Sequence, residues 1–154
     1  MPKPYSLQVS QDIHAPIDRV FDLVNDLSRL NEWSPFVAMD STIVSEISGP
    51  ASGVGSRYSW KGKRIGSGSM TMSVCTKPYK IAFDMEFNGK DTALSEYLLT
   101  ETDGVTTITW FLGGERGFGG QLMNMLFKFD KMMAKNFADG LASLKKLVEA
   151  EVQK

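Results

Sequence analysis

The sequence has little of what builds common metal and thiol sites. Its 154 residues include one histidine, His14, and one cysteine, Cys75. Zinc-finger, facial-triad and histidine-rich sites use two or more histidines, so we predict no metal and no cofactor. One cysteine cannot form an internal disulfide, and no Asn-x-Ser/Thr sequence is present. These features are typical of a cytoplasmic protein.

Long apolar runs and a one-sided charge are also missing. No apolar run approaches the roughly 18 residues of a membrane span, and the first residues lack the apolar core of a secretory signal. Seventeen basic and 18 acidic residues give a net charge of −1, whereas nucleic-acid binders usually carry a basic excess. We therefore expect no transmembrane segment and no nucleic-acid partner. The length suggests one domain over residues 1–154, and no feature sets an oligomeric state.

The N-terminal third predicts a strand followed by two short helices. Apolar and polar residues alternate over residues 5–13, which is typical of a half-buried strand. Pro16 suits the start of the helix that follows, where apolar residues recur at helical spacing. Ser28 is predicted to cap a second short helix. Pro35 ends that helix, because the residue before a proline avoids helical angles.

The rest of the chain predicts an antiparallel sheet and then one long helix. Turn signals divide residues 39–113 into about six strands, and Asp103-Gly104 is a hairpin signal. Apolar residues from Leu122 to Val148 then follow steps of three or four, as in an amphipathic helix. Gly140 lies inside that helix, where it costs about 1 kcal/mol relative to alanine. This cost indicates a close backbone approach or a bend.

The order of elements and several short segments resemble one superfamily. The segments are residues 13–26 (IHAPIDRVFDLVND), 32–36 (EWSPF), 66–70 (GSGSM), 104–110 (GVTTITW) and 140–145 (GLASLK). They resemble the START-like (SRPBCC) superfamily, and most of all its bacterial polyketide cyclase/dehydrase-type branch. The resemblance implies an α+β helix-grip fold, also called START- or Bet v1-like. A curved antiparallel sheet would wrap around a long C-terminal helix, with two short helices after the first strand.

A curved sheet that grips one helix need not pack solidly, so an apolar cavity between them is a candidate ligand site. Nine methionines, which are adaptable apolar side chains, favour such a cavity. Its wall is predicted to comprise Trp33, Phe36, Tyr58, Trp60, Met70, Met72, Phe83, Met85, Tyr97, Trp110, Phe118, Met125, Phe129 and Met133. We expect it to hold a hydrophobic small molecule such as a lipid, polyketide or isoprenoid, for transport or sequestration. The same residues could instead form an ordinary core.

Three residues are candidate polar anchors for such a ligand. Glu96 and Tyr97 are adjacent on a predicted strand, so only one of them faces the cavity. The alternation leaves this choice open, and the resemblance favours Tyr97. If Glu96 faces inward, burial raises its pKa and makes it a candidate acid or base. Arg116 lies in the glycine-rich segment 113–120, which lacks a Walker or Gly-x-Gly-x-x-Gly pattern and is otherwise a connector or gate.

The other reactive side chains are predicted to have no catalytic role. His14 alternates with the polar side of the first strand, which favours a surface position. Cys75 is predicted to share a face with Thr71 and Ser73, and no histidine lies near it in the sequence to activate the thiol. Asp84 and Glu86 alternate with apolar neighbours and are expected to face solvent.

Two alternative functions stay open. A cyclase or dehydratase would need at least two polar groups that converge in the cavity, and the sequence supplies few. A protein-interaction module of the Hsp90-activator kind would instead have a filled interior and an exposed patch. The lysines of the long helix also suit a membrane surface, although the fold needs the apolar stripe of that helix to cover the sheet.

Overall fold

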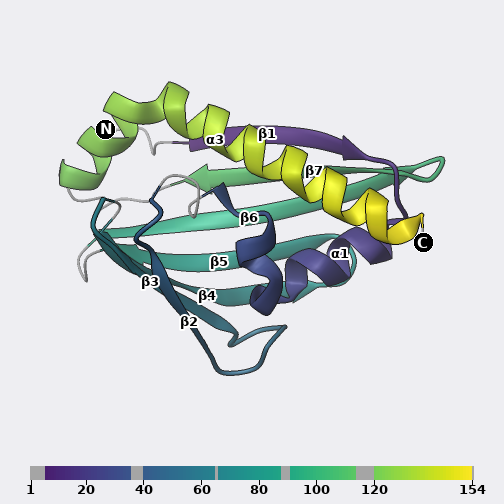
Figure 1. Cartoon of the computed structure of the whole chain (residues 1–154), viewed down its shortest axis with the longest axis horizontal. Coiled ribbons are helices and arrows are strands. Elements are labelled where there is room, and N and C mark those ends of the chain that lie inside the picture. Colours follow the sequence, from purple (N-terminus) through teal and green to yellow (C-terminus); the bar gives the residue numbers. More distant parts are fainter. Residues whose placement is uncertain (1–5, 36–39, 65, 88–90, 114–119, 154) are drawn as a thin grey trace.

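The computed structural model describes residues 6–35, 40–64, 66–87, 91–113 and 120–153. It contains a seven-stranded antiparallel sheet in the order β1-β7-β6-β5-β4-β3-β2 (Figure 1). The strands are β1 (Ser6–Ile13), β2 (Val44–Ser48), β3 (Arg57–Gly62), β4 (Gly66–Thr76), β5 (Lys80–Phe87), β6 (Asp91–Thr102) and β7 (Val105–Gly113). The helices are α1 (Ile17–Asn25), the 3-10 helix η1 (Leu27–Glu32) and α3 (Gly120–Val152). The predicted α+β helix-grip fold is confirmed.

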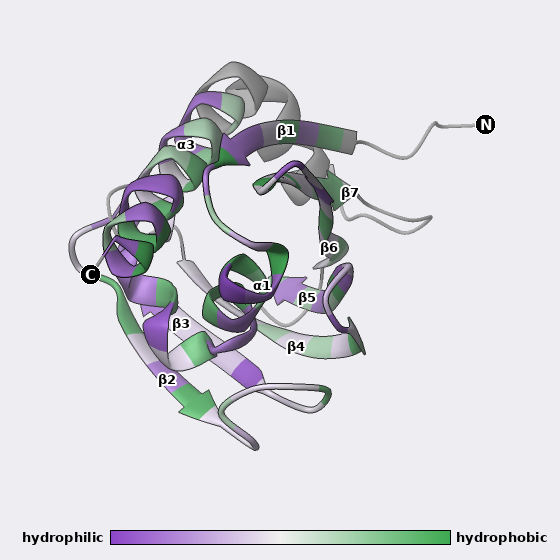
Figure 2. Cartoon of the chain, turned by 90° about the vertical axis from the view of Figure 1, so that its right-hand side faces the viewer, coloured by the Kyte–Doolittle hydropathy of each residue, from purple (hydrophilic) through white to green (hydrophobic). Residues whose placement is uncertain are grey.

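The sheet curves around α1, and α3 lies across the open side of the curve beside β1 (Figure 2). We call the side of the sheet toward the helices the inner face and the opposite side the outer face. The backbone contacts between helices and strands among the described residues concentrate on β1, β6 and β7. The helices therefore lie closest to one half of the sheet, and β3 to β5 form the other half.

The first two helices begin where side chains satisfy their free backbone N–H groups. Pro16 precedes α1 and offers no side-chain cap, and the Glu101 carboxylate of β6 accepts the Ile17 N–H at 2.7 Å instead. The prediction that Ser28 caps the second helix is wrong. Asp26 is the cap, because its carboxylate accepts the Ser28 N–H at 3.0 Å and the Ser28 hydroxyl at 2.6 Å. Asp26 stands two residues ahead of the donor it caps, as this motif requires.

The hairpin between β6 and β7 forms at the predicted place. Asp103 and Gly104 have φ angles of 52° and 81°, and they connect Thr102 directly to Val105. Two consecutive positive φ angles match the twist of the flanking strands in a two-residue hairpin. Aspartate and glycine tolerate these angles, so the local sequence was sufficient to predict this turn.

A register shift in β4 reverses one predicted side-chain direction. The pairing of β4 with β5 is irregular between Met72 and Val74. After the shift, Cys75 pairs with the buried Ile81, and its Sγ lies 3.6 Å from the Asn25 side-chain oxygen of α1. Cys75 thus faces the helix side rather than sharing the outer face with Thr71. One extra residue in a strand moves the next side chain to the opposite face.

The C-terminal half of α3 covers the sheet with its predicted apolar stripe. Phe137, Leu141, Leu144 and Val148 are all buried. Gly140 interrupts the stripe where α3 meets the segment after η1. A β-carbon there would lie 2.8 Å from Pro35 Cδ and 3.3 Å from the carbonyl oxygen of Trp33. The glycine thus marks a close approach between two backbones.

Polar contacts hold the end of α3 against the start of the chain. Glu149 accepts the His14 backbone N–H at 2.8 Å and the Lys145 ammonium at 2.6 Å. Arg29 of η1 binds both Glu32 and Glu151. These contacts pin the C-terminal turns of α3 to the β1–α1 junction and to η1.

Candidate functional site

The inner face of β3 to β5 is built from aromatic and thioether side chains. Trp60, Met70, Met72, Phe83 and Met85 are buried and occupy alternate positions on these strands. The cross-strand pairs Met70–Met85 and Met72–Phe83 place them side by side. We call these five residues the methionine wall. It lies on the half of the sheet that the helix backbones approach less closely.

Sequence reasoning left one member of this surface out. Phe87 pairs with Gly68, and its ring centroid lies 5.8 Å from that of Trp60 in an edge-to-face contact. Gly68 leaves room for the Trp60 indole, because a β-carbon there would lie 2.4 Å from Trp60 Cζ2. The alternation of β5 already put Phe87 on the same face as Met85, so this signal was present.

The remaining predicted wall residues fall in three groups. Trp33, Tyr58, Tyr97 and Trp110 are buried on the helix side. Phe36, Arg116 and Phe118 lie outside the described residues. Met125, Phe129 and Met133 belong to the first half of α3, where the structure describes the backbone only.

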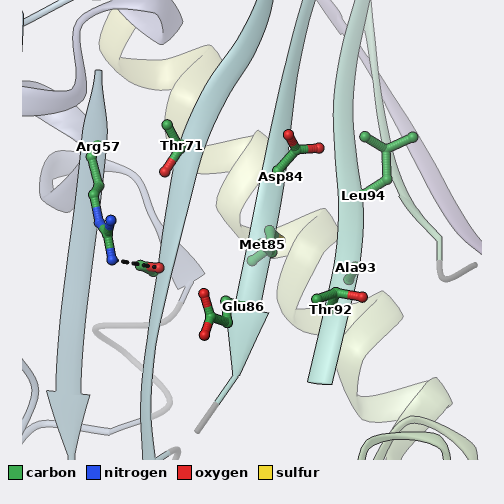
Figure 3. A pocket seen from close by; sticks show the side chains of 9 residues that line it. Arg57, Thr71, Asp84, Met85, Glu86, Thr92, Ala93 and Leu94 are labelled. Atoms are coloured by element: carbon green, nitrogen blue, oxygen red, sulfur yellow. Dashed lines mark hydrogen bonds between the residues drawn. The ribbon is translucent and has the colours of Figure 1, made fainter. Parts of the chain in front are cut away.

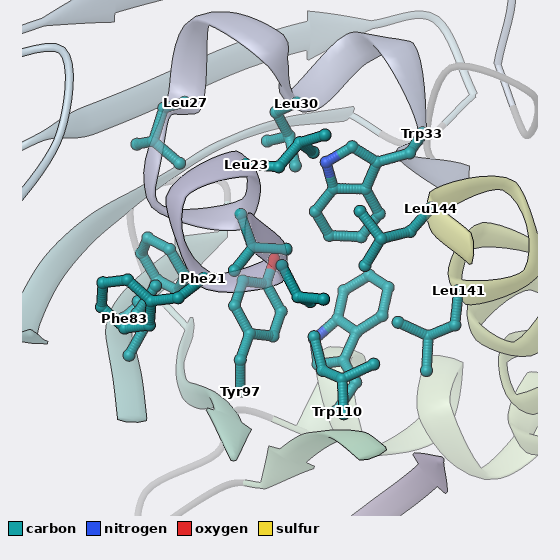
Figure 4. Packing of buried hydrophobic residues seen from close by; sticks show 14 of the residues in the cluster. Phe21, Leu23, Leu27, Leu30, Trp33, Phe83, Tyr97, Trp110, Leu141 and Leu144 are labelled. Carbon is teal, nitrogen blue, oxygen red and sulfur yellow. The ribbon is translucent and has the colours of Figure 1, made fainter. Parts of the chain in front are cut away.

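An aromatic cluster closes the inner face beside the methionine wall (Figure 4). Ring centroids of Trp33, Tyr97 and Trp110 lie 5.6 to 5.9 Å from one another at steep angles. Phe83 contacts Tyr97 at 5.5 Å and so joins this cluster to the wall. On the other side, Trp110 stacks on Phe137 of α3 with centroids 3.8 Å apart and planes 10° apart. In the described part of the molecule, α3 and the sheet are in direct contact here.

Of the neighbours Glu96 and Tyr97, it is Tyr97 that lies on the inner face of the sheet. Tyr97 is 1% exposed and pairs with Ile81 and Trp110, which are also buried on the inner face. Glu96 is half-buried and pairs with Ala82 and Phe111 on the outer face. Burial raises the pKa of the Tyr97 phenol well above its usual value, and no charge or hydrogen bond from a described residue contributes. The hydroxyl therefore stays protonated at neutral pH.

The polar atoms of these aromatic residues differ in how they are satisfied. The Trp110 indole N–H donates to Ser95 Oγ at 2.9 Å, and the Tyr58 hydroxyl donates to Asn31 Oδ1 at 2.7 Å. The Trp33 indole nitrogen is buried and has no hydrogen-bond partner within the described ranges. Sequence reasoning treated Trp33 only as apolar wall, because a missing partner cannot be inferred from a residue type.

The outer face carries a separate depression of about 380 Å³ over β3 to β6 (Figure 3). Arg57, Thr71, Asp84, Glu86 and Thr92 contribute to it, and Arg57 donates to Ser69 Oγ at 3.3 Å. Asp84 and Glu86 are exposed, as predicted. This polar depression lies behind the methionine wall, on the other side of the sheet.

Two further findings concern partners. Among the described residues, no helix combines the length and the hydropathy that crossing a membrane requires. Within the same residues, no three histidine, cysteine, aspartate or glutamate side chains lie close enough together to hold a metal ion. His14 is exposed at the end of β1.

The sequence matches the family model described as polyketide cyclase / dehydrase and lipid transport over residues 4–149. No curated protein matches it. Among solved structures, TTHA0849 from Thermus thermophilus is 18% identical with a TM-score of 0.69, and the match covers 96% of this chain and 99% of the other.

Two other solved structures carry more descriptive names. The Aha1 dimer from Colwellia psychrerythraea is 15% identical with a TM-score of 0.65, covering 94% of this chain and 96% of the other. DynU16, a protein of the dynemicin biosynthetic locus, is 17% identical with a TM-score of 0.65, covering 94% of this chain and 47% of the other. At these identities the likeness shows the fold alone.

Proposed function

This chain belongs to the polyketide cyclase/dehydrase and lipid transport family, and from that premise we propose that it binds a hydrophobic small molecule against the inner face of its sheet. A lipid, a polyketide or an isoprenoid would fit this description. The ligand would lie over the methionine wall, with the aromatic cluster at its inner end. Binding for transport or sequestration is the proposed role.

The observation that carries this proposal is the composition of the methionine wall. Three of its five members are methionines, which are flexible and polarisable, and which adapt to ligands of irregular shape. The other two, Trp60 and Phe83, offer flat apolar surfaces. The helix backbones approach this half of the sheet less closely than they approach β1, β6 and β7. A guest molecule on this half of the sheet would therefore displace less helix backbone.

The driving force would be removal of apolar surface from water. Burial contributes about 25 cal/mol per Å² of apolar area before the costs of association are subtracted. A polar end of the ligand would need a hydrogen-bonding group inside the protein, because an unpaired buried polar atom is costly. Tyr97 is the proposed anchor on this face, and the outward direction of Glu96 removes it from that role.

The protonation state of Tyr97 supports binding more than catalysis. A cyclase or dehydratase must move protons, and a general base must be able to give up its own proton near neutral pH. A tyrosine phenol is neutral at pH 7 at its ordinary pKa of about 10, and burial raises the pKa of Tyr97 further, so the hydroxyl can donate a hydrogen bond but does not serve as a base. Catalysis is therefore the second candidate function, and it would require Tyr97 to act as a proton donor.

Native mass spectrometry of protein purified from its host tests the proposal. We expect an added mass that denaturation releases, and extraction should identify it as an apolar molecule. The same protein, stripped of ligand, should bind fluorene saturably with one-to-one stoichiometry, measured by displacement of the dye 8-anilinonaphthalene-1-sulfonate. The bare mass of the chain, together with no saturable binding of fluorene, would contradict the proposal.

A further inference from the structure

The buried indole N–H of Trp33 is a hydrogen-bond donor without an acceptor. Trp33 follows η1 and is 2% exposed, and its Nε1 finds no partner among the described side chains and backbone. Buried tryptophan N–H groups usually have partners, and each exception requires a physical explanation. Leaving such a donor unpaired destabilises the ligand-free protein, so an acceptor that reaches it would bind favourably.

Two aromatic neighbours of Trp33 carry N–H or O–H donors of their own. The ring centroids of Trp110 and Trp33 lie 5.8 Å apart, and the Trp110 indole N–H donates a hydrogen bond to Ser95 Oγ. Tyr97 lies 5.9 Å from Trp33, and its hydroxyl points from β6 toward the helices, into the layer that also holds the Trp33 indole (Figure 4). Two neutral donors thus share one apolar layer, and no charged group contributes to the raised pKa of the Tyr97 phenol.

We propose that Trp33 Nε1 binds a carbonyl oxygen of the ligand, with the Tyr97 hydroxyl of the same layer as a second donor. This inference rests on the proposed function and narrows it to a class of ligand: apolar molecules that carry a ketone, quinone or ester carbonyl. A carbonyl oxygen has two lone pairs and no proton, so it accepts from two donors and needs no acceptor in return. A hydrocarbon of the same shape would leave the Trp33 N–H unpaired.

A carboxylate fits this layer less well than a neutral carbonyl. Its charge would have to leave water for an apolar environment, and no cation contributes to the pKa of the Tyr97 phenol. The two donors are themselves neutral, because an indole N–H does not ionise and the phenol keeps its proton. The site therefore selects on the presence of a neutral acceptor oxygen.

A matched pair of ligands tests this selection. Fluorene and 9-fluorenone have the same shape, and they differ by a methylene group against a carbonyl. We expect the wild-type protein to bind 9-fluorenone roughly 5- to 30-fold more tightly than fluorene, the ratio expected from one or two neutral hydrogen bonds. In Trp33→Phe the two affinities should become nearly equal, and in Tyr97→Phe the ratio should fall part of the way.

Indole NMR signals of the wild-type protein provide a test that needs no variant to fold. The chain has three tryptophans, so three indole N–H resonances are expected. That of Trp33 should move downfield when 9-fluorenone is added and should stay in place with fluorene, because only the ketone offers an acceptor. Equal wild-type affinities for the two probes, or a Trp33 resonance that ignores the ketone, would overturn the anchor and leave apolar binding intact. Binding of neither probe would overturn the proposed function and the anchor with it.

Discussion

Gly140 of α3 lies directly against the ring of Pro35, so that a β-carbon on Gly140 would approach Pro35 Cδ to 2.8 Å. Real β-carbons do not come this close to rigid neighbours. The contact fixes the height at which α3 crosses the segment after η1, and Phe137, one turn earlier, stacks on Trp110 at 3.8 Å. These two contacts set the distance between the helix and the aromatic cluster.

The first prediction concerns Gly140. Alanine is favoured over glycine in a helix interior by about 1 kcal/mol, but its β-carbon would force α3 away from Pro35. Overpacking of this kind costs about 1–3 kcal/mol, so we expect Gly140→Ala to lower the free energy of unfolding in urea. Ser143→Ala, at an exposed position of the same helix, should be neutral or slightly stabilising. A more stable Gly140→Ala variant would contradict the close approach.

The second prediction concerns the stack between Trp110 and Phe137. Phe137 is 1% exposed, and removing a buried ring costs about 3–5 kcal/mol. Phe137→Ala should therefore lower the unfolding free energy by that amount. Phe111→Ala is the control, because Phe111 neighbours Trp110 but lies half-buried on the outer face, where the loss should be about 1 kcal/mol. Similar losses in both variants would argue against α3 packing on the cluster.

The third prediction is a pH dependence from Glu149. Lys145 and the His14 backbone N–H stabilise its charged form and lower its pKa in the folded protein below that of the unfolded chain. The stabilisation is therefore present above pH 4.5 or so and is lost as the pH falls through the folded pKa. Glu149→Gln should cost about 1 kcal/mol at pH 7, and this difference from wild type should shrink in acid. Urea unfolding at several pH values measures the difference, and a gap that stays constant down to about pH 3 would contradict this role.

The sequence was sufficient wherever a pattern depends on near neighbours. The strict alternation of β5 correctly separated Phe83 and Met85 from Asp84 and Glu86, because side chains on a regular strand alternate between faces. The hairpin at Asp103 and Gly104 followed from backbone angles that few other residue pairs adopt. The helix-grip order followed from the same local periodicities together with the family resemblance.

The rest depends on contacts between distant parts of the chain. Cys75 was assigned to the wrong face because the irregular pairing near Met72 involves a partner strand and leaves no local mark. The choice of Tyr97 over Glu96 is set by the cross-strand neighbours Ile81 and Trp110. The sequence predicted that Gly140 destabilises the helix relative to alanine. The reason for the glycine is the contact with Pro35, which lies about one hundred residues earlier in the sequence.

The central claim is that the inner face of the sheet, and not the outer face, binds an apolar ligand. Met85 and Asp84 are adjacent on β5 and face opposite sides, so Met85→Trp and Asp84→Trp place the same large side chain on the two faces. The most direct measurement is the affinity of each variant for fluorene, with thermal unfolding to confirm that both are folded. We predict that Met85→Trp weakens binding about tenfold or more, the effect of losing about 1.4 kcal/mol, while Asp84→Trp leaves it unchanged. Unchanged affinity in Met85→Trp, or an equal loss in both variants, would contradict the account.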